Sequence, residues 1–162
     1  MGTLRIRPTT SEDEASLWGL LEPVFRAGDT YAIPMDITQR EAISYWRSAS
    51  HRVYVAEEDE IIGSYYLKTN QQGGGDHVCN AAFITSPAAR GRGVARTMLQ
   101  HAIDTAREAG FRAMQFNFVV ETNAGAIRLW RSEGFEVVGR LPKAFRHPER
   151  GDVDALVMFR LL

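Results

Sequence analysis

The sequence predicts a single α/β (α+β) domain with one mixed, mostly antiparallel sheet of about seven strands and helices on both faces. Three observations support this prediction. The 162 residues are enough for one domain that buries roughly 70% of its unfolded surface. Strand-like and helix-like hydrophobic periods follow one another in the order β-α-α-β-β-β-α-β-α-β-β. No repeat, low-complexity tract or linker divides the chain, so residues 1–162 are predicted to form one domain.

The first half of the chain contains four strand patterns and two helix starts. Leu4–Pro8 alternates and stops at proline, and Ser11 with Glu14 forms a capping box ahead of an apolar helix face. Thr38 with Glu41 marks a second helix start in the same way. The other strands are predicted over Arg52–Ala56, Ile61–Leu67 and His77–Thr85, with an acidic hairpin turn and the segment NQQGGGD between them.

The second half alternates helices and strands, with a glycine after each helix. From Val94 the apolar residues recur at helical spacing, and Gly110 stands where a helix ends in the left-handed conformation. A shorter helix is predicted over Asn123–Glu133, with Gly134 as its stop. The strands here are predicted over Ala113–Val120, Phe135–Leu141 and Val153–Leu161, with PKAFRHPERGD as the loop between the last two.

The composition indicates a soluble protein without a nucleic-acid or membrane surface. With 44% hydrophobic residues, 24% charged residues and a net charge of −1, the chain has no basic footprint for either partner. The only cysteine, Cys79, excludes an internal disulfide and fits a reducing compartment, and no cluster of ligands predicts a metal site. No apolar run approaches the ~20 residues of a membrane span, and no signal-peptide pattern begins the chain. We therefore expect a cytoplasmic protein.

The segment SPAARGRGVARTM places three arginines and two glycines between a strand and a helix. A helix N-terminus offers unpaired N–H groups and partial positive charge, and glycines let the preceding backbone curl around an anion. The turn therefore predicts a pyrophosphate site; the alternative is a capped loop with solvated arginines. A P-loop is excluded because no Gly-Lys-Ser/Thr is present, and the dinucleotide fingerprint fails because Arg96 stands where a small residue is needed.

Two motifs then point to one family. Arg90-x-x-Gly93-x-Ala95, following Pro87, resembles the acetyl-CoA signature of the GCN5-related N-acetyltransferases, the GNAT superfamily. About 30 residues on, NAGAIRLWRSEGF at Asn123–Phe135 is similar to that superfamily's later helix. At a finer level, the pattern HVCNAAF…FNFVVETN…LPKAFRHP…VDALVM resembles the branch that includes the proline-analogue (azetidine-2-carboxylate) acetyltransferases.

The resemblance implies a GNAT fold whose splayed strand pair forms an acetyl-CoA cleft. The backbone of Phe83, Ile84 and Thr85 is then expected to pair with the pantetheine arm as an added strand. Asn123 is expected near the thiol end of acetyl-CoA, and a homodimer is common in the family. The pyrophosphate and the rest of the carrier are expected on Arg90, Gly91, Arg92, Gly93, Val94, Ala95 and Arg96.

The catalytic residues of the family cannot all be assigned to positions in this chain. Many members place a tyrosine acid where this chain has Trp130, and some place a glutamate base where it has Phe118. Asn80 and Asn117 are amides within apolar strands, where burial requires a partner. They are the candidate catalytic residues: they could bind a substrate carboxylate, polarise the thioester carbonyl, or simply be satisfied core amides. Glu121 could draw a proton from the amine through water.

We therefore expect an acetyl-CoA-dependent N-acetyltransferase that acetylates a small amine, such as an amino acid or proline analogue, by direct transfer in a ternary complex. One alternative is the same fold acetylating a protein N-terminus or an antibiotic. The other is a non-catalytic acyl-CoA-binding module, which would need no acid. Release of free thiol from acetyl-CoA in the presence of an amine separates the module from the enzymes.

Overall fold

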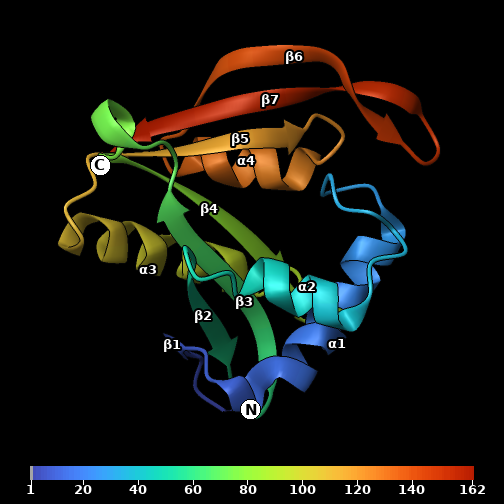
Figure 1. Cartoon of the computed structure of the whole chain (residues 1–162), viewed down its shortest axis with the longest axis vertical. Helices are drawn as coiled ribbons and strands as arrows, with labels where there is room; N and C mark the ends of the chain where they lie inside the picture. The colour runs from blue at the N-terminus through green and yellow to red at the C-terminus, as the bar shows by residue number, and fades with distance from the viewer. Residues whose placement is uncertain (1) are drawn as a thin grey trace.

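The computed structural model describes residues 2–162, which contain one seven-stranded sheet and four α-helices (Figure 1). The strands are β1 (Arg5–Pro8), β2 (Arg52–Glu57), β3 (Ile61–Thr69), β4 (Val78–Thr85), β5 (Ala113–Val120), β6 (Glu136–His147) and β7 (Gly151–Leu161). The helices are α1 (Glu14–Ala27), α2 (Gln39–Trp46), α3 (Val94–Glu108) and α4 (Ala124–Ser132). The sheet order is β1-β2-β3-β4-β5-β7-β6, and every neighbouring pair is antiparallel except β4 and β5. The predicted fold class and element order are confirmed.

Helices cover both faces of the sheet. Because consecutive strand residues point to opposite faces, Tyr65 and Tyr66 of β3 belong to different cores. Tyr66 packs in the core that α1 and α2 form with the sheet, together with Trp46. Tyr65 packs on the other face, in the core that contains Trp130 of α4 and the apolar side of α3. Cys79 is fully buried in this second core, where burial raises the pKa of its thiol to about 12.

Strands β4 and β5 separate along their length, as the resemblance implied. They are paired only where Val78–Asn80 meets Ala113–Gln115. Beyond that point, the pairing of β5 with β7 is interrupted by a bulge between Phe116 and Val119. Figure 1 shows the two strands starting together and diverging toward their C-terminal ends. The divergence leaves a gap in the middle of the sheet, into which one edge of β4 faces.

The helix starts confirm one prediction and correct another. Thr38 caps α2 as expected: its hydroxyl accepts from the Glu41 N–H and donates to the Glu41 carboxylate. The capping pair ahead of α1 is Thr10 with Asp13, one position earlier than the predicted Ser11 with Glu14. The Thr10 N–H donates to the Asp13 carboxylate at 2.8 Å. A short 3₁₀ turn over Ser11–Asp13 precedes α1.

The β6–β7 hairpin is longer than the sequence predicted. The segment expected as a loop continues both strands, so that only residues 148–150 connect them. Phe145 pairs with Val153 and is buried with Val120. This apolar contact was not predicted, because Phe145 stands in a mostly polar segment of the sequence. A register shift between Leu141 and Phe145 accommodates Lys143, whose φ is 51°.

Arg7 of β1 joins three elements through two carboxylates. Its guanidinium donates to both oxygens of Asp13 at 2.8 and 2.9 Å, and to both oxygens of Glu57 on β2 at 3.0 Å. Asp13 is only 7% exposed. These hydrogen bonds hold the pKa of Asp13 and of Glu57 below the usual range.

We expect Arg7→Met to lower the free energy of unfolding by about 2 kcal/mol, because the Asp13 carboxylate would stay buried without its cation. The melting temperature should fall by about 4–8 °C. Since both carboxyl pKa values are depressed in the folded state, the Arg7 contribution is present at neutral pH and disappears as pH falls through those values. Thermal melts at pH 7 and pH 3.5 should therefore show a smaller difference at the lower pH. Arg5→Met, which removes an exposed partner of Glu57, is the control and should cost under about 1 kcal/mol.

Candidate active site

One edge of β4 carries backbone groups that the sheet does not use. The Ser86 N–H donates to the Ile62 carbonyl and the Asn70 N–H donates to the Val78 carbonyl, so residues with even numbers on β4 bond to β3. The backbone groups of Phe83 and Thr85 consequently face the gap, where β5 is no longer paired. Ile84 corrects the expectation for this segment: it pairs with Ser64 of β3, and its backbone is not available to a ligand.

The turn after β4 presents a set of free N–H groups at the start of α3. Gly91 and Gly93 have φ values of 77° and 78°, a left-handed conformation that glycine adopts without strain. The first backbone bond of the helix runs from the Thr97 N–H to the Gly93 carbonyl. Within residues 2–162, no hydrogen bond is made by the N–H groups of Gly91, Gly93, Val94, Ala95 and Arg96. These free N–H groups have the chemistry to hold a pyrophosphate, and the pyrophosphate site stays a prediction.

The arginines of this turn have different environments. Arg92 donates to both oxygens of Glu58 at 2.6 Å, and Arg96 forms an ion pair with Glu133 at the end of α4. Arg90 is exposed and has no ion pair among the described residues. Charge for an incoming phosphate is thus available mainly from Arg90, while the Arg96 pair fixes the start of α3 against α4.

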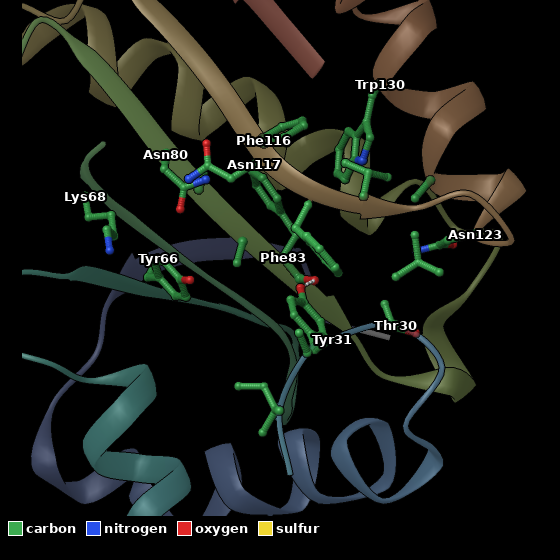
Figure 2. Close-up of a pocket in the computed structure, with 18 of the residues that line it drawn as sticks. Thr30, Tyr31, Tyr66, Lys68, Asn80, Phe83, Phe116, Asn117, Asn123 and Trp130 are labelled. Carbon is green, nitrogen blue, oxygen red and sulfur yellow. Dashed lines mark hydrogen bonds between the residues drawn. The ribbon is translucent and has the colours of Figure 1, made fainter. Parts of the chain in front are cut away.

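Two cavities meet beside the gap. The larger, of about 780 Å³, runs along the turn and is lined by Thr85, the start of α3 and the tip of the β6–β7 hairpin. The smaller, of about 350 Å³, lies under the α1–α2 loop and between residues 80–83 of β4 and 116–120 of β5, where the two strands diverge (Figure 2). The residues that line both cavities are Thr30, Tyr31, Phe83, Asn123, Ala126 and Trp130. We call this shared region the junction.

Tyr31 stands at the junction and was not predicted from the sequence. Its hydroxyl donates to the gap-facing Phe83 carbonyl at 2.6 Å, and its ring packs edge-on against Phe25 and Trp46. Burial raises the pKa of Tyr31, so the hydroxyl remains a neutral donor. The position falls in the turn-rich segment RAGDTYAIPMD, where no periodic pattern indicates which side chain points inward.

Asn123 and Trp130 approach the junction from α4. Asn123 precedes the helix, but its side chain does not cap it and makes no hydrogen bond within residues 2–162. Its amide is therefore free for a ligand in the larger cavity, where the resemblance placed the thiol end of the carrier. Trp130 is 8% exposed and packs against Phe83 and Phe116, with ring centroids 5.3 and 4.9 Å away.

The two candidate catalytic asparagines line the smaller cavity alone. Asn80 is half-buried, and its amide donates to the Gln115 carbonyl at 2.9 Å. The expectation that Asn117 is buried was wrong: its side chain is exposed and donates to the Asn70 side chain at 2.7 Å. The β5 bulge that follows Phe116 breaks the regular alternation on which the expectation rested. Both amides therefore lie beside the smaller cavity and away from the turn.

The polar side chains of the smaller cavity are hydroxyl, amide and ammonium groups. None of the residues that line it carries a carboxylate or an imidazole. Glu121, which was expected to draw a proton from the amine, lines neither cavity and forms an ion pair with Arg140 at 2.8 Å. Within residues 2–162, no three His, Cys, Asp or Glu side chains are grouped to hold a metal ion, and no helix is long and apolar enough to span a membrane.

The site thus combines a long cavity at a glycine-rich turn with a smaller cavity that meets it at the junction, which gives room for two substrates side by side. Comparison with known proteins agrees. The model of the acetyltransferase (GNAT) family matches residues 14–135. The chain therefore belongs to the GNAT family and is an acetyl-CoA-dependent N-acetyltransferase.

Individual relatives extend the match to nearly the whole chain. N-acetyltransferase aca1 of Schizosaccharomyces pombe is 30% identical over 80% of this chain and 71% of its own length. A GNAT enzyme from Kribbella flavida is 41% identical, with a TM-score of 0.92 over 98% of both chains. A phosphinothricin acetyltransferase from Sinorhizobium meliloti, solved with acetyl-CoA, has a TM-score of 0.86 over 99% of this chain and 89% of its own. At 21% identity, this last likeness concerns the fold alone.

Trp130→Phe should leave kcat within about tenfold, because the indole contributes apolar packing while loss of a true catalytic acid commonly costs about 10²–10⁴. The affinity for acetyl-CoA should be unchanged. Steady-state kinetics with a thermal melt checks this expectation. A folded variant that is slowed a thousandfold, with unchanged acetyl-CoA affinity, would show that Trp130 takes part in the chemistry.

Proposed function

We propose that the enzyme transfers the acetyl group of acetyl-CoA directly to the amine of a small molecule, with both substrates bound together. The observation that carries the proposal is the junction, where a carrier-sized cavity meets a smaller one at the backbone groups of Phe83 that the sheet does not use. The acceptor cavity, as we call the smaller one, has a volume of about 350 Å³, which suits a small molecule better than a folded protein.

The carrier site is proposed to use the backbone more than side chains. The pantetheine arm would pair with the gap-facing groups of Phe83 and Thr85, in the manner of an added strand. The pyrophosphate would accept from the free N–H groups between Gly91 and Arg96, with Arg90 at the rim. Asn123 would contact the thiol end. Together these proposed contacts would bring the thioester to the junction.

The chemistry needs a neutral amine, a donor for the developing oxyanion and a leaving thiolate. The cavity favours the neutral amine, because it has no carboxylate to hold an ammonium ion and desolvation lowers an amine pKa. The Phe83 N–H faces the gap and can donate to the thioester oxygen as it gains charge. A thiol has a pKa near 8.5, so its departure needs little assistance.

Asn80 and Asn117 are proposed to contact the acceptor, since both line its cavity and neither lines the carrier cavity. Asn117→Ala should then raise the acceptor KM roughly tenfold, with kcat and acetyl-CoA affinity nearly unchanged. If the amide instead stabilises the oxyanion, kcat will fall by about 10²–10³. A lower melting temperature with unchanged kinetics would assign Asn117 a structural role only.

The proposal is tested by following free-thiol release from acetyl-CoA with a panel of amines, antibiotics and peptides with free N-termini. We expect release with small amines, and formation of the N-acetyl product confirmed by mass. Release with peptides or antibiotics alone would favour the other acetyltransferase classes. Tight acetyl-CoA binding without release for any member would identify a binding module.

A further inference from the structure

The acceptor cavity is polar at the end away from the junction. Figure 2 shows Lys68, Asn80 and Asn117 together at this end, with Phe83 and Trp130 toward the other. Lys68 and Asn80 are direct partners across β3 and β4, so their side chains lie on the same face of the sheet. Lys68 is half-buried and is the only charged residue lining the cavity, and within residues 2–162 its ammonium group makes no hydrogen bond or ion pair.

This end of the cavity offers hydrogen-bond donors in excess. Lys68 contributes an ammonium group with three donors. The hydroxyls of Tyr45 and Tyr66 are 3.0 Å apart and use one hydrogen between them, which leaves the other to donate. Asn80 and Asn117 each spend one amide hydrogen on another group and keep a second. A half-buried cation among donors, with no carboxylate along the cavity, calls for an anionic ligand.

The position of this donor-rich end also sets the distance between the anionic group of an acceptor and its amine. Phe83 follows Asn80 by three residues on β4, a distance of about 10 Å at ~3.3 Å per residue. Because the donor and the anion that it holds take up a few ångströms of this distance, roughly 5–8 Å remain between the anion and an amine at the junction. In an extended carbon chain, this separation corresponds to about four to six bonds.

We propose that the acceptor is a small amino acid whose carboxylate lies at the opposite end of the molecule from the acetylated amine, and that Lys68 binds this carboxylate. The inference rests on the proposed function, because it needs the amine to be delivered to the junction. It assigns Lys68 as the specificity-determining residue, supported by the amides of Asn80 and Asn117.

The first test is a homologous series of acceptors in the thiol-release assay: glycine, β-alanine, 4-aminobutyrate, 5-aminovalerate and 6-aminohexanoate, each beside its neutral carboxamide. We expect kcat/KM to be highest for the four- to six-carbon acids and at least tenfold lower for the matching carboxamides. A flat profile, a maximum at glycine, or equal rates for acids and carboxamides would overturn the inference. If thiol is released with none of these and with no amine of the wider panel, the proposed function itself fails.

The second test removes the charge. Lys68→Met should raise the KM of the preferred acid at least tenfold, leave kcat within about threefold and leave the carboxamide unaffected. Lys68→Arg, which keeps the cation, should restore much of the preference. Lys143→Met is the matched control, because Lys143 is the chain's only other lysine, is exposed and lines neither cavity. Equal loss for acid and carboxamide in a folded Lys68→Met enzyme would overturn the assignment.

Discussion

Gly93→Val should weaken CoA binding by at least a hundredfold while the protein remains folded. Gly93 has a φ of 78°, where a β-branched residue is strained by about 1–3 kcal/mol. A Cβ added at this position would meet no described atom within 4 Å, so the variant does not fail through a clash in the core. The backbone would relax toward negative φ instead, and the N–H groups that follow would no longer converge on the pyrophosphate.

The chain provides a matched control at the opposite end of the same helix. Gly110, just after α3, has a φ of 91° and equally open surroundings. Gly110→Val should lower the melting temperature by a similar amount and leave CoA affinity unchanged. Calorimetric titration of both variants with CoA checks the pair. Near-native affinity in folded Gly93→Val would remove the turn from the carrier site.

Tyr31→Ala should reduce kcat with any acceptor by about a hundredfold, because Tyr31 lines both cavities at the junction and fills part of the space between the two substrates. Without it, water can reach the junction and the thioester loses its fixed position, a displacement that can cost about 10² in rate. Thiol release in the absence of an amine should rise for the same reason. Tyr31→Phe keeps the ring and loses only the hydrogen bond to the Phe83 carbonyl, so it should stay within about tenfold of the original rate.

The variant also removes a buried ring, and its effect on stability must be separated from its effect on catalysis. Phe25→Leu is a suitable control: Phe25 is 1% exposed, packs edge-on against Tyr31 and lines neither cavity. It should lower the melting temperature yet retain its rate per folded molecule. If Tyr31→Ala behaves like Phe25→Leu at a temperature where both are folded, Tyr31 is structural and not part of the reaction site.

The backbone geometry of the proposed carrier turn could be predicted from the sequence because it is local. The glycines at 91 and 93 and the helix that begins at Val94 are adjacent in the chain, so their consequence for N–H groups follows without knowing the rest of the fold. The divergence of β4 and β5 came only from the resemblance. The Ile84 backbone was wrongly expected to be free for a ligand. Successive residues of a strand direct their backbone hydrogen bonds to opposite neighbours, and the register with β3 decides which residues bond to β3.

The acceptor half could not be read in this way, since its residues come from separate parts of the chain. Lys68 looks like an ordinary strand-end lysine until its pairing with Asn80 places it beside the cavity. Tyr31 lies in an irregular loop whose course depends on the packing of α1 against α2. The exposure of Asn117 depends on a bulge that β7 creates by its pairing. Each of these features depends on tertiary contacts, which a sequence pattern does not reveal.

The edge of β4 that the sheet does not use should make the stability of the folded protein depend on its co-substrate. A strand edge that lacks its partner is an incomplete ladder, and the pantetheine arm would supply the missing hydrogen bonds in the folded state only. By mass action, free acetyl-CoA at a hundred times its Kd would stabilise the native state by about 2.7 kcal/mol. The unfolded fraction, on which proteases act, would then fall about a hundredfold. Amide hydrogen exchange in β4 and β5 should slow in step, so the lifetime of the folded enzyme would depend on the concentration of acetyl-CoA.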